Sequence, residues 1–249
     1  MKSIKPFLIL QLRPEDEASD NELDAFLKFG GLTPENVRRI RIEKESIGAI
    51  HLEDYSGVLV GGGPSNVSDD ETKKPDNQKR FENELKGLLT KITEKDFPFL
   101  GGCYGIGILA SFLGAKISKE RYSEDVGAVE IVLSEDGQQD KLAKGVANQF
   151  KAFAGHKEAC QNLPENVVLL AGNSDCPIQM VRYKNNIYAT QFHTELDQQG
   201  LELRINTYRH AGYFPPEGAE MLIAESKHEV ITEPEKILKN FINIYAKPA

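Results

Sequence analysis

The chain has 249 residues, of which 40% are apolar and 27% charged, a globular composition, and its formal net charge of −8 argues against general binding to nucleic-acid phosphates. Its longest apolar runs have the length of a strand and fall far short of the roughly 20 residues that span a bilayer. The sequence starts without a cleavable apolar segment and its three cysteines form no Cys-x-x-Cys pair, so we expect a cytoplasmic protein with no disulfide framework and no metal site.

Apolar runs and helical stripes alternate along the first part of the chain, which is the pattern of a sheet with helices on its faces. Residues 6–12 predict a buried strand, and Ser19 to Glu22 has the pattern of a capping box at the start of a helix. Residues 37–42 predict a second strand, whose arginines favour an edge or a partly exposed position. Residues 55–60 predict a third strand, which ends at a run of glycines.

A polar segment over residues 68–79 predicts an exposed loop that leads into a helix. The apolar stripe of this helix consists of Phe81, Leu85, Leu88 and Ile92. Residues 97–100 predict a short strand that stops at Gly101, and residues 106–113 predict a helix that Gly114 ends.

Strand signals dominate the second half of the chain. They lie at residues 126–133, 167–171, 177–183 and 187–192, with Asn185-Asn186 as the turn of a hairpin between the last two. A helix around residues 201–208, a Gly/Pro-rich loop over residues 212–218 and a final helix capped by Thr232 follow. The final helix should dock through Ile237, Phe241, Ile244 and Tyr245. We expect residues 1–249 to form a single α/β domain with a doubly wound, mostly parallel sheet and helices on both faces.

Cys103 lies in the sequence Gly101-Gly102-Cys103-Tyr104-Gly105, on a sharp turn between a predicted strand and a predicted helix. The flanking glycines let the strand and the helix approach closely while the cysteine takes a strained backbone conformation. The turn presents the sulfur beside a helix N-terminus, whose dipole favours the thiolate. Cys103 is therefore a candidate nucleophile, and we expect its position alone to activate it.

His193 and Glu195 follow a predicted strand and supply a candidate base and an acid that orients it. Residues two apart in an extended chain point to the same face, so Glu195 can reach the ring nitrogen of His193 that faces away from Cys103. The order Cys…His-x-Glu is compatible with a catalytic triad, which is defined by roles and not by chain order.

A third motif, Gly61-Gly62-Gly63-Pro64-Ser65, again follows a predicted strand. Glycines let backbone N–H groups approach a developing oxyanion, and Pro64 stiffens the loop. One N–H from Gly62 or Gly63 and one from Tyr104 would form an oxyanion hole.

At these residues the sequence resembles the class I, triad-type glutamine amidotransferases. Gly102-Cys103-Tyr104-Gly105 is similar to their nucleophile elbow, Gln191-Phe192-His193-Thr194-Glu195 to their histidine–glutamate motif, and the glycine motif to their oxyanion loop. The resemblance covers most of the chain, and it is strongest to stand-alone proteins similar to the amidotransferase domain of GMP synthase.

The resemblance implies a flavodoxin-like fold and hydrolysis of the glutamine side-chain amide through a thioester on Cys103, without a metal or organic cofactor. Gly107, Gly155 and His156 match positions that contact the substrate in the family. It also implies a partner protein, because the ammonia usually passes to a synthetase domain or subunit. No contact with nucleic acid or a membrane is implied.

Two positions depart from the family pattern. Gly107 stands where members commonly carry a glutamine that contacts the substrate, and Thr194 stands where the motif usually has proline. Two alternatives therefore stay open: hydrolysis of another γ-glutamyl amide or peptide, and a non-catalytic protein that regulates a partner. For His156, an exposed loop position is an equal alternative to a place in the substrate pocket. We expect Cys160 and Cys176 to be structural.

Overall fold

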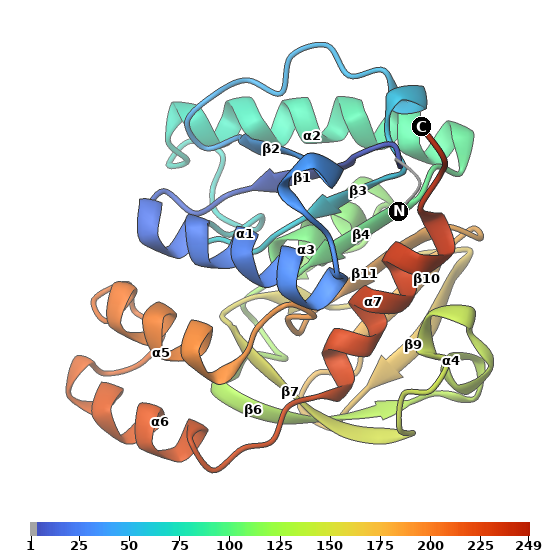
Figure 1. Cartoon of the computed structure of the whole chain (residues 1–249). Helices are drawn as coiled ribbons and strands as arrows, with labels where there is room; N and C mark the ends of the chain where they lie inside the picture. Colours follow the sequence, from blue (N-terminus) through green and yellow to red (C-terminus); the bar gives the residue numbers. More distant parts are fainter. Residues whose placement is uncertain (1–3) are drawn as a thin grey trace.

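The computed structural model describes residues 4–249 (Figure 1). Nine strands within these residues form one sheet: β1 (Phe7–Gln11), β2 (Val37–Arg41), β3 (Gly57–Val60), β4 (Phe99–Gly102), β6 (Glu124–Leu133), β7 (Gln149–His156), β9 (Val167–Gly172), β10 (Met180–Tyr183) and β11 (Ile187–Thr190). Their spatial order is β2-β1-β3-β4-β11-β10-β9-β6-β7. A small separate sheet pairs β5 (Ile117–Ser118) with β8 (Ala159–Cys160).

The sheet has a parallel part and an antiparallel part. Parallel pairing runs from β2 through β1, β3 and β4 to β11, and Leu59 of β3 lies level with Ile9 on one side and Leu100 on the other. From β11 onward β10, β9, β6 and β7 are antiparallel. The carboxyl ends of β3, β4 and β11 therefore lie side by side, where α/β proteins place their sites.

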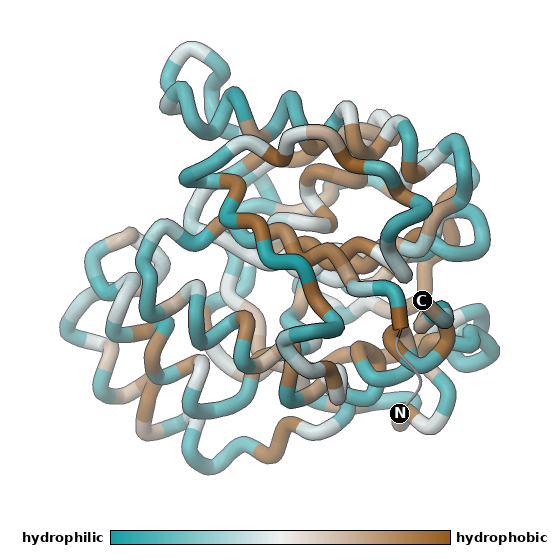
Figure 2. The backbone as a smooth tube through the Cα atoms, turned by 45° about the horizontal axis from the view of Figure 1, so that its top comes forward, coloured by the Kyte–Doolittle hydropathy of each residue, from teal (hydrophilic) through white to brown (hydrophobic). Residues whose placement is uncertain are grey.

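Helices cover both faces of the sheet, as the sequence predicts (Figure 1). They are α1 (Asp16–Gly30), α2 (Asp76–Lys95), α3 (Tyr104–Phe112), α4 (Glu135–Gln139), α5 (Gln198–Thr207), α6 (Ala219–Ser226) and α7 (Glu233–Tyr245). Leu8 and Leu10 of β1 pack in the core formed with α2 and α3, whereas Phe7 and Ile9 pack in the core formed with α1 and α7. Because both faces are buried, β1 reads as a continuous apolar run. Figure 2 shows hydrophobic residues along these central strands and hydrophilic ones on the outer loops.

The predicted capping box at the first helix is wrong. α1 begins at Asp16, four residues earlier than a helix capped by Ser19 would, and its N-cap Glu15 makes no side-chain cap bond. Ser19 and Glu22 are instead fully buried, and both bond to Gln11 at the end of β1. These two polar side chains therefore form hydrogen bonds with the buried side chain of Gln11 and do not cap the helix.

Several element predictions are confirmed and others fail for local reasons. The edge position of β2, the hairpin of β10 and β11 and the buried stripe of α2 are as predicted. Strand β7 was missed because its Ala and Gly residues carry a weak strand signal, and α6 was missed because it directly follows the Gly/Pro-rich loop. Ile244 is 40% exposed, and Leu238 and Ile242 pack in its place on the buried face of α7.

No helix within residues 4–249 is both long and apolar enough to cross a membrane.

Candidate active site

Cys103 occupies the turn between β4 and α3 with φ 52° and ψ −97°, a strained conformation for a residue with a side chain. Its backbone N–H donates to the carbonyl of Thr190, 2.8 Å away, which ties the turn to the neighbouring β11. A Cβ on Gly101 would lie 2.9 Å from the backbone of Gly105, so only glycine permits this approach of strand and helix. The predicted strand–turn–helix geometry is present.

His193 follows β11, the strand that pairs with β4. Its Nδ1 lies 2.9 Å from Oε1 of Glu195, the contact expected from their spacing, and both side chains are buried. A Cβ on Gly62 would lie 2.8 Å from Cε1 of His193 and 3.3 Å from Cβ of Cys103. The three motifs, which are far apart in the sequence, therefore meet around Gly62.

The loop after β3 is held from several sides. Both carboxylate oxygens of Glu158 accept from backbone N–H groups, those of Val67 and Ser68, at 2.7 and 2.8 Å. The buried ammonium of Lys74 donates to the carbonyl of Val67, so this part of the predicted solvated segment is interior. The side-chain amide of Gln78 donates to the carbonyl of Asn66. These contacts hold residues 66–68, which directly follow the glycine motif.

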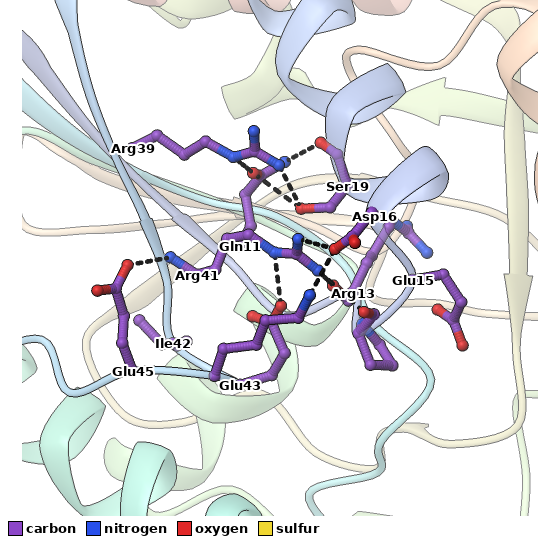
Figure 3. A network of polar contacts seen from close by, with 12 residues as sticks. Gln11, Arg13, Glu15, Asp16, Ser19, Arg39, Arg41, Ile42, Glu43 and Glu45 are labelled. Atoms are coloured by element: carbon purple, nitrogen blue, oxygen red, sulfur yellow. Dashed lines mark hydrogen bonds and ion pairs between the residues drawn. The ribbon is translucent and has the colours of Figure 1, made fainter.

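Two buried arginines lie beside this group, and sequence reasoning missed both. Nη2 of Arg204, on α5, lies 3.1 Å from Oε1 of Glu195, and Nη1 lies 3.2 Å from Nδ1 of His193. Arg13 donates from Nε to Glu22, 2.9 Å away. Its backbone carbonyl accepts from Arg41, within the polar network at the end of β1 that Figure 3 shows. Two signals were available: Arg13 directly follows a strand predicted to be buried, and Arg204 shares the apolar face of its helix.

These charges and the burial set the protonation of the site. Burial lowers the pKa of His193 and outweighs the raising effect of Glu195, while Arg204 lowers it further. Burial would raise the pKa of Glu195, but His193 and Arg204 lower it well below its usual value. At neutral pH the pair is therefore a neutral imidazole held by a carboxylate.

The expectation that position alone activates Cys103 is wrong. Burial raises the pKa of its thiol to about 11, although Arg13 and Arg204 act in the opposite direction. A thiol with this pKa is not ionised at neutral pH, although it lies at the N-terminus of α3. The thiol therefore carries its proton at neutral pH, and the neutral imidazole of His193 lines the same cavity.

Two cavities meet at Cys103, and Gly63, Gly155 and Tyr213 also line both. The smaller one, with a volume of about 20 Å³, is lined by the three predicted substrate positions Gly107, Gly155 and His156. A Cβ on Gly107 would lie 3.3 Å from Val67 and 3.6 Å from Glu158, so these side chains fill the space beside it. The larger cavity, with a volume of about 60 Å³, is lined by His193 and both arginines.

His156 is buried on β7, so its alternative placement in an exposed loop is wrong. Its Nε2 lies 2.7 Å from Oε2 of Glu124, which also accepts from Gln179. Within residues 4–249, Glu124, His156 and Cys176 form a group whose ligand atoms lie within 4.8 Å of one another, close enough to hold a metal ion. Hydrogen bonds from Asn173 and Gln179 already stabilise the carboxylate of Glu124 without a metal ion. Cys160 and Cys176 are buried, as expected.

Known proteins share this fold. A solved glutamine amidotransferase from Thermotoga maritima superposes with a TM-score of 0.77 at 18% identity, covering 97% of this chain and 98% of the other. One from Methylobacillus flagellatus superposes with a TM-score of 0.73 at 17% identity, covering 99% and 98%.

The family model described as glutamine amidotransferase class-I matches residues 21–205, and the chain belongs to this family. One subunit of the glutamine-hydrolysing GMP synthase of Methanosphaera stadtmanae is 32% identical over 142 residues, which are 56% of this chain and 65% of that protein. The corresponding subunit of Pyrococcus abyssi is 29% identical over 57% of this chain and 66% of that protein. The chain thus spans just under two thirds of these relatives.

Proposed function

We propose that this protein hydrolyses the side-chain amide of glutamine, with Cys103 as nucleophile, His193 as general base and acid, and Glu195 as the group that orients His193. The observation that carries the proposal is the meeting of a strained cysteine, a carboxylate-bound histidine and a glycine loop around Gly62. Each of these features costs stability or needs a precise fit, and a purely structural role explains none of them.

In the proposed reaction, His193 takes the thiol proton as Sγ of Cys103 attacks the amide carbon. The C–N bond breaks as His193 returns the proton to nitrogen, so ammonia leaves a γ-glutamyl thioester. Water then attacks the thioester, His193 takes a proton from it, and the C–S bond breaks as the sulfur is protonated again. One glutamine and one water give one glutamate and one ammonia, and no step needs a cofactor.

The remaining predicted site residues fit this reaction. We assign the backbone N–H groups of Gly62 or Gly63 and of Tyr104 to the oxyanion that forms on the amide carbon. Losing one such donor typically costs on the order of 100- to 1000-fold in turnover. The walls of the smaller cavity, with Gly107, Gly155 and His156, would hold the glutamyl part of the substrate.

We further propose that residues 1–249 act as one amidotransferase domain and that the ammonia serves a separate synthetase protein. The names of the relatives, which are subunits of glutamine-hydrolysing GMP synthases, support a partner of this kind. Co-purification of this protein with candidate synthetases tests for such a partner.

The test compares glutamate release from glutamine by the wild type and by Cys103→Ala. We expect the substitution to reduce release at least roughly a thousandfold, because the nucleophile is lost. Cys160→Ala, which removes another buried thiol, is the control and should retain activity. A diazoketone analogue of glutamine should label Cys103. Absence of labelling together with equal rates in both variants would support the non-catalytic alternative and reject the proposal.

A further inference from the structure

The larger cavity and the smaller cavity lie on different sides of the reacting atoms. Tyr104, whose N–H we assign to the oxyanion, lines only the smaller cavity, and His193 lines only the larger one. The general acid must contact the nitrogen that leaves. The acyl group of a substrate therefore belongs in the smaller cavity, and its leaving group belongs in the larger cavity.

The larger cavity is much too spacious for ammonia. Its volume of about 60 Å³ is several times the roughly 10 to 15 Å³ that one water-sized molecule needs. Most of the wall is apolar, formed by residues of α5 and of the loop after it such as Leu201, Ile205 and Phe214. A leaving group with an apolar side chain fits this wall.

Two guanidinium groups also line this cavity, and each pairs with a buried glutamate, Arg13 with Glu22 and Arg204 with Glu195. Both arginines are more than nine-tenths buried. Nε of Arg204 has no hydrogen-bond partner among the described residues, and Nη2 of Arg13 lies 3.0 Å from the position of a Cβ on Gly62, next to the reacting atoms. A buried donor without an acceptor is costly, and a carboxylate is the acceptor that guanidinium groups bind most strongly.

We propose that the larger cavity binds the leaving amine of γ-glutamyl peptides, namely an amino acid with an apolar side chain whose carboxylate contacts Arg13 and Arg204. The proposal rests on the proposed function and extends its substrate beyond glutamine. The chemistry is the same: the C–N bond to the amino acid breaks, His193 protonates its nitrogen, and water releases glutamate from the thioester. One peptide and one water give glutamate and one free amino acid.

The first test uses the wild type with three substrates: γ-glutamyl-phenylalanine, γ-glutamyl-phenethylamide, which lacks the carboxylate, and glutamine. We expect kcat/KM for the peptide to exceed the values for the phenethylamide and for glutamine at least tenfold. Equal values for the peptide and the phenethylamide would overturn the role of the arginines. A peptide cleaved more slowly than glutamine would overturn the leaving-group cavity itself.

The second test fills the cavity from a residue outside the catalytic group. Val126 of β6 is half-buried and lines the larger cavity, whereas Val132 of the same strand is exposed and lines neither cavity. We expect Val126→Phe to lower the ratio of peptide to glutamine kcat/KM at least tenfold and Val132→Phe to leave this ratio unchanged. An unchanged ratio in a folded Val126→Phe protein would contradict the proposal, and if that variant does not fold, the wild-type comparison decides.

The two proposals fail in different ways. Hydrolysis of glutamine that depends on Cys103, without any cleavage of the peptide, rejects the leaving-group cavity and leaves the proposed function intact. If none of the three substrates is cleaved and the glutamine analogue does not label Cys103, both proposals are rejected.

Discussion

His193 lies between a carboxylate and a guanidinium that act on its pKa in opposite directions. Glu195 raises this pKa, and Arg204, along with burial, lowers it. The net pKa lies below the usual value, so the imidazole stays neutral to lower pH than an exposed histidine does. Because burial raises the pKa of the Cys103 thiol to about 11, the neutral imidazole is the form that would take its proton in the proposed reaction.

Removing the charge of Glu195 and removing the charge of Arg204 should shift the pKa of His193 in opposite directions. Glu195→Gln should lower the pKa of His193 further, so that the acid limb of kcat/KM moves to lower pH, while kcat falls by on the order of 100- to 10,000-fold because the ring loses its orientation. Arg204→Gln should raise the pKa and move the limb to higher pH. Histidine NMR titrations together with pH–rate profiles measure both effects.

The control for this comparison is Arg209→Gln, because Arg209 pairs at the surface with Glu220 and does not contact the site. Its titration should match that of the wild type. Shifts of the same sign in Glu195→Gln and Arg204→Gln would show that the two charges do not control His193.

At the scale of elements, the site depends on how closely β4 and α3 approach at the turn. A Cβ on Gly101 would lie 2.9 Å from backbone atoms of Gly105, whereas a Cβ on the adjacent Gly102 would meet only the carbonyl of Val60, at 3.9 Å. Backbone atoms cannot move aside as the end of a side chain can. Two neighbouring glycines in one strand therefore have different roles.

Alanine at each of these positions tests the difference. Gly101→Ala should destabilise the protein by about 1 to 3 kcal/mol through overpacking. Gly102→Ala should change stability by at most about 1 kcal/mol, in the stabilising direction, because alanine restricts the unfolded chain. Denaturant unfolding of both variants measures the two free energies. Equal losses would mean that both glycines serve backbone geometry and not the close approach.

At the scale of the whole molecule, one buried polar network joins segments that are distant in sequence. Glu22 of α1 lies 2.9 Å from Nε of Arg13, after β1, and 3.8 Å from Nη2 of Arg204 on α5. Arg204 in turn contacts Glu195. The network thus connects the first strand and the first helix of the chain to the candidate catalytic group.

Neutralising the centre of this network should weaken the whole fold. Glu22→Gln leaves Arg13 buried without its partner charge and should cost about 3 to 5 kcal/mol, measured by denaturant unfolding. Asp20→Asn on the same helix breaks an ion pair between Arg39 and a largely exposed carboxylate, and it should cost at most about 1 kcal/mol. Similar losses in the two variants would contradict a special role for the buried pair.

The sequence by itself determined the sheet with helices on both faces, the turn at Cys103 and the contact of His193 with Glu195. These features follow from local signals: apolar periodicity, glycines at fixed offsets from a cysteine, and two residues on one face of an extended chain. It also placed Gly107, Gly155 and His156 together, because their motifs resemble those of a known family.

Only the tertiary structure decided the charge and the shape of the site. The pKa of the Cys103 thiol depends on burial, which is produced only by folding. The position of Cys103 at the start of a helix does not reveal this burial. Arg13 and Arg204 reach the site from opposite ends of the chain, and no spacing in the sequence expresses that meeting. The two cavities likewise arise where the segments after β3, β4 and β11 meet β7, with α5 as a further wall of the larger one. These segments contact one another only after folding.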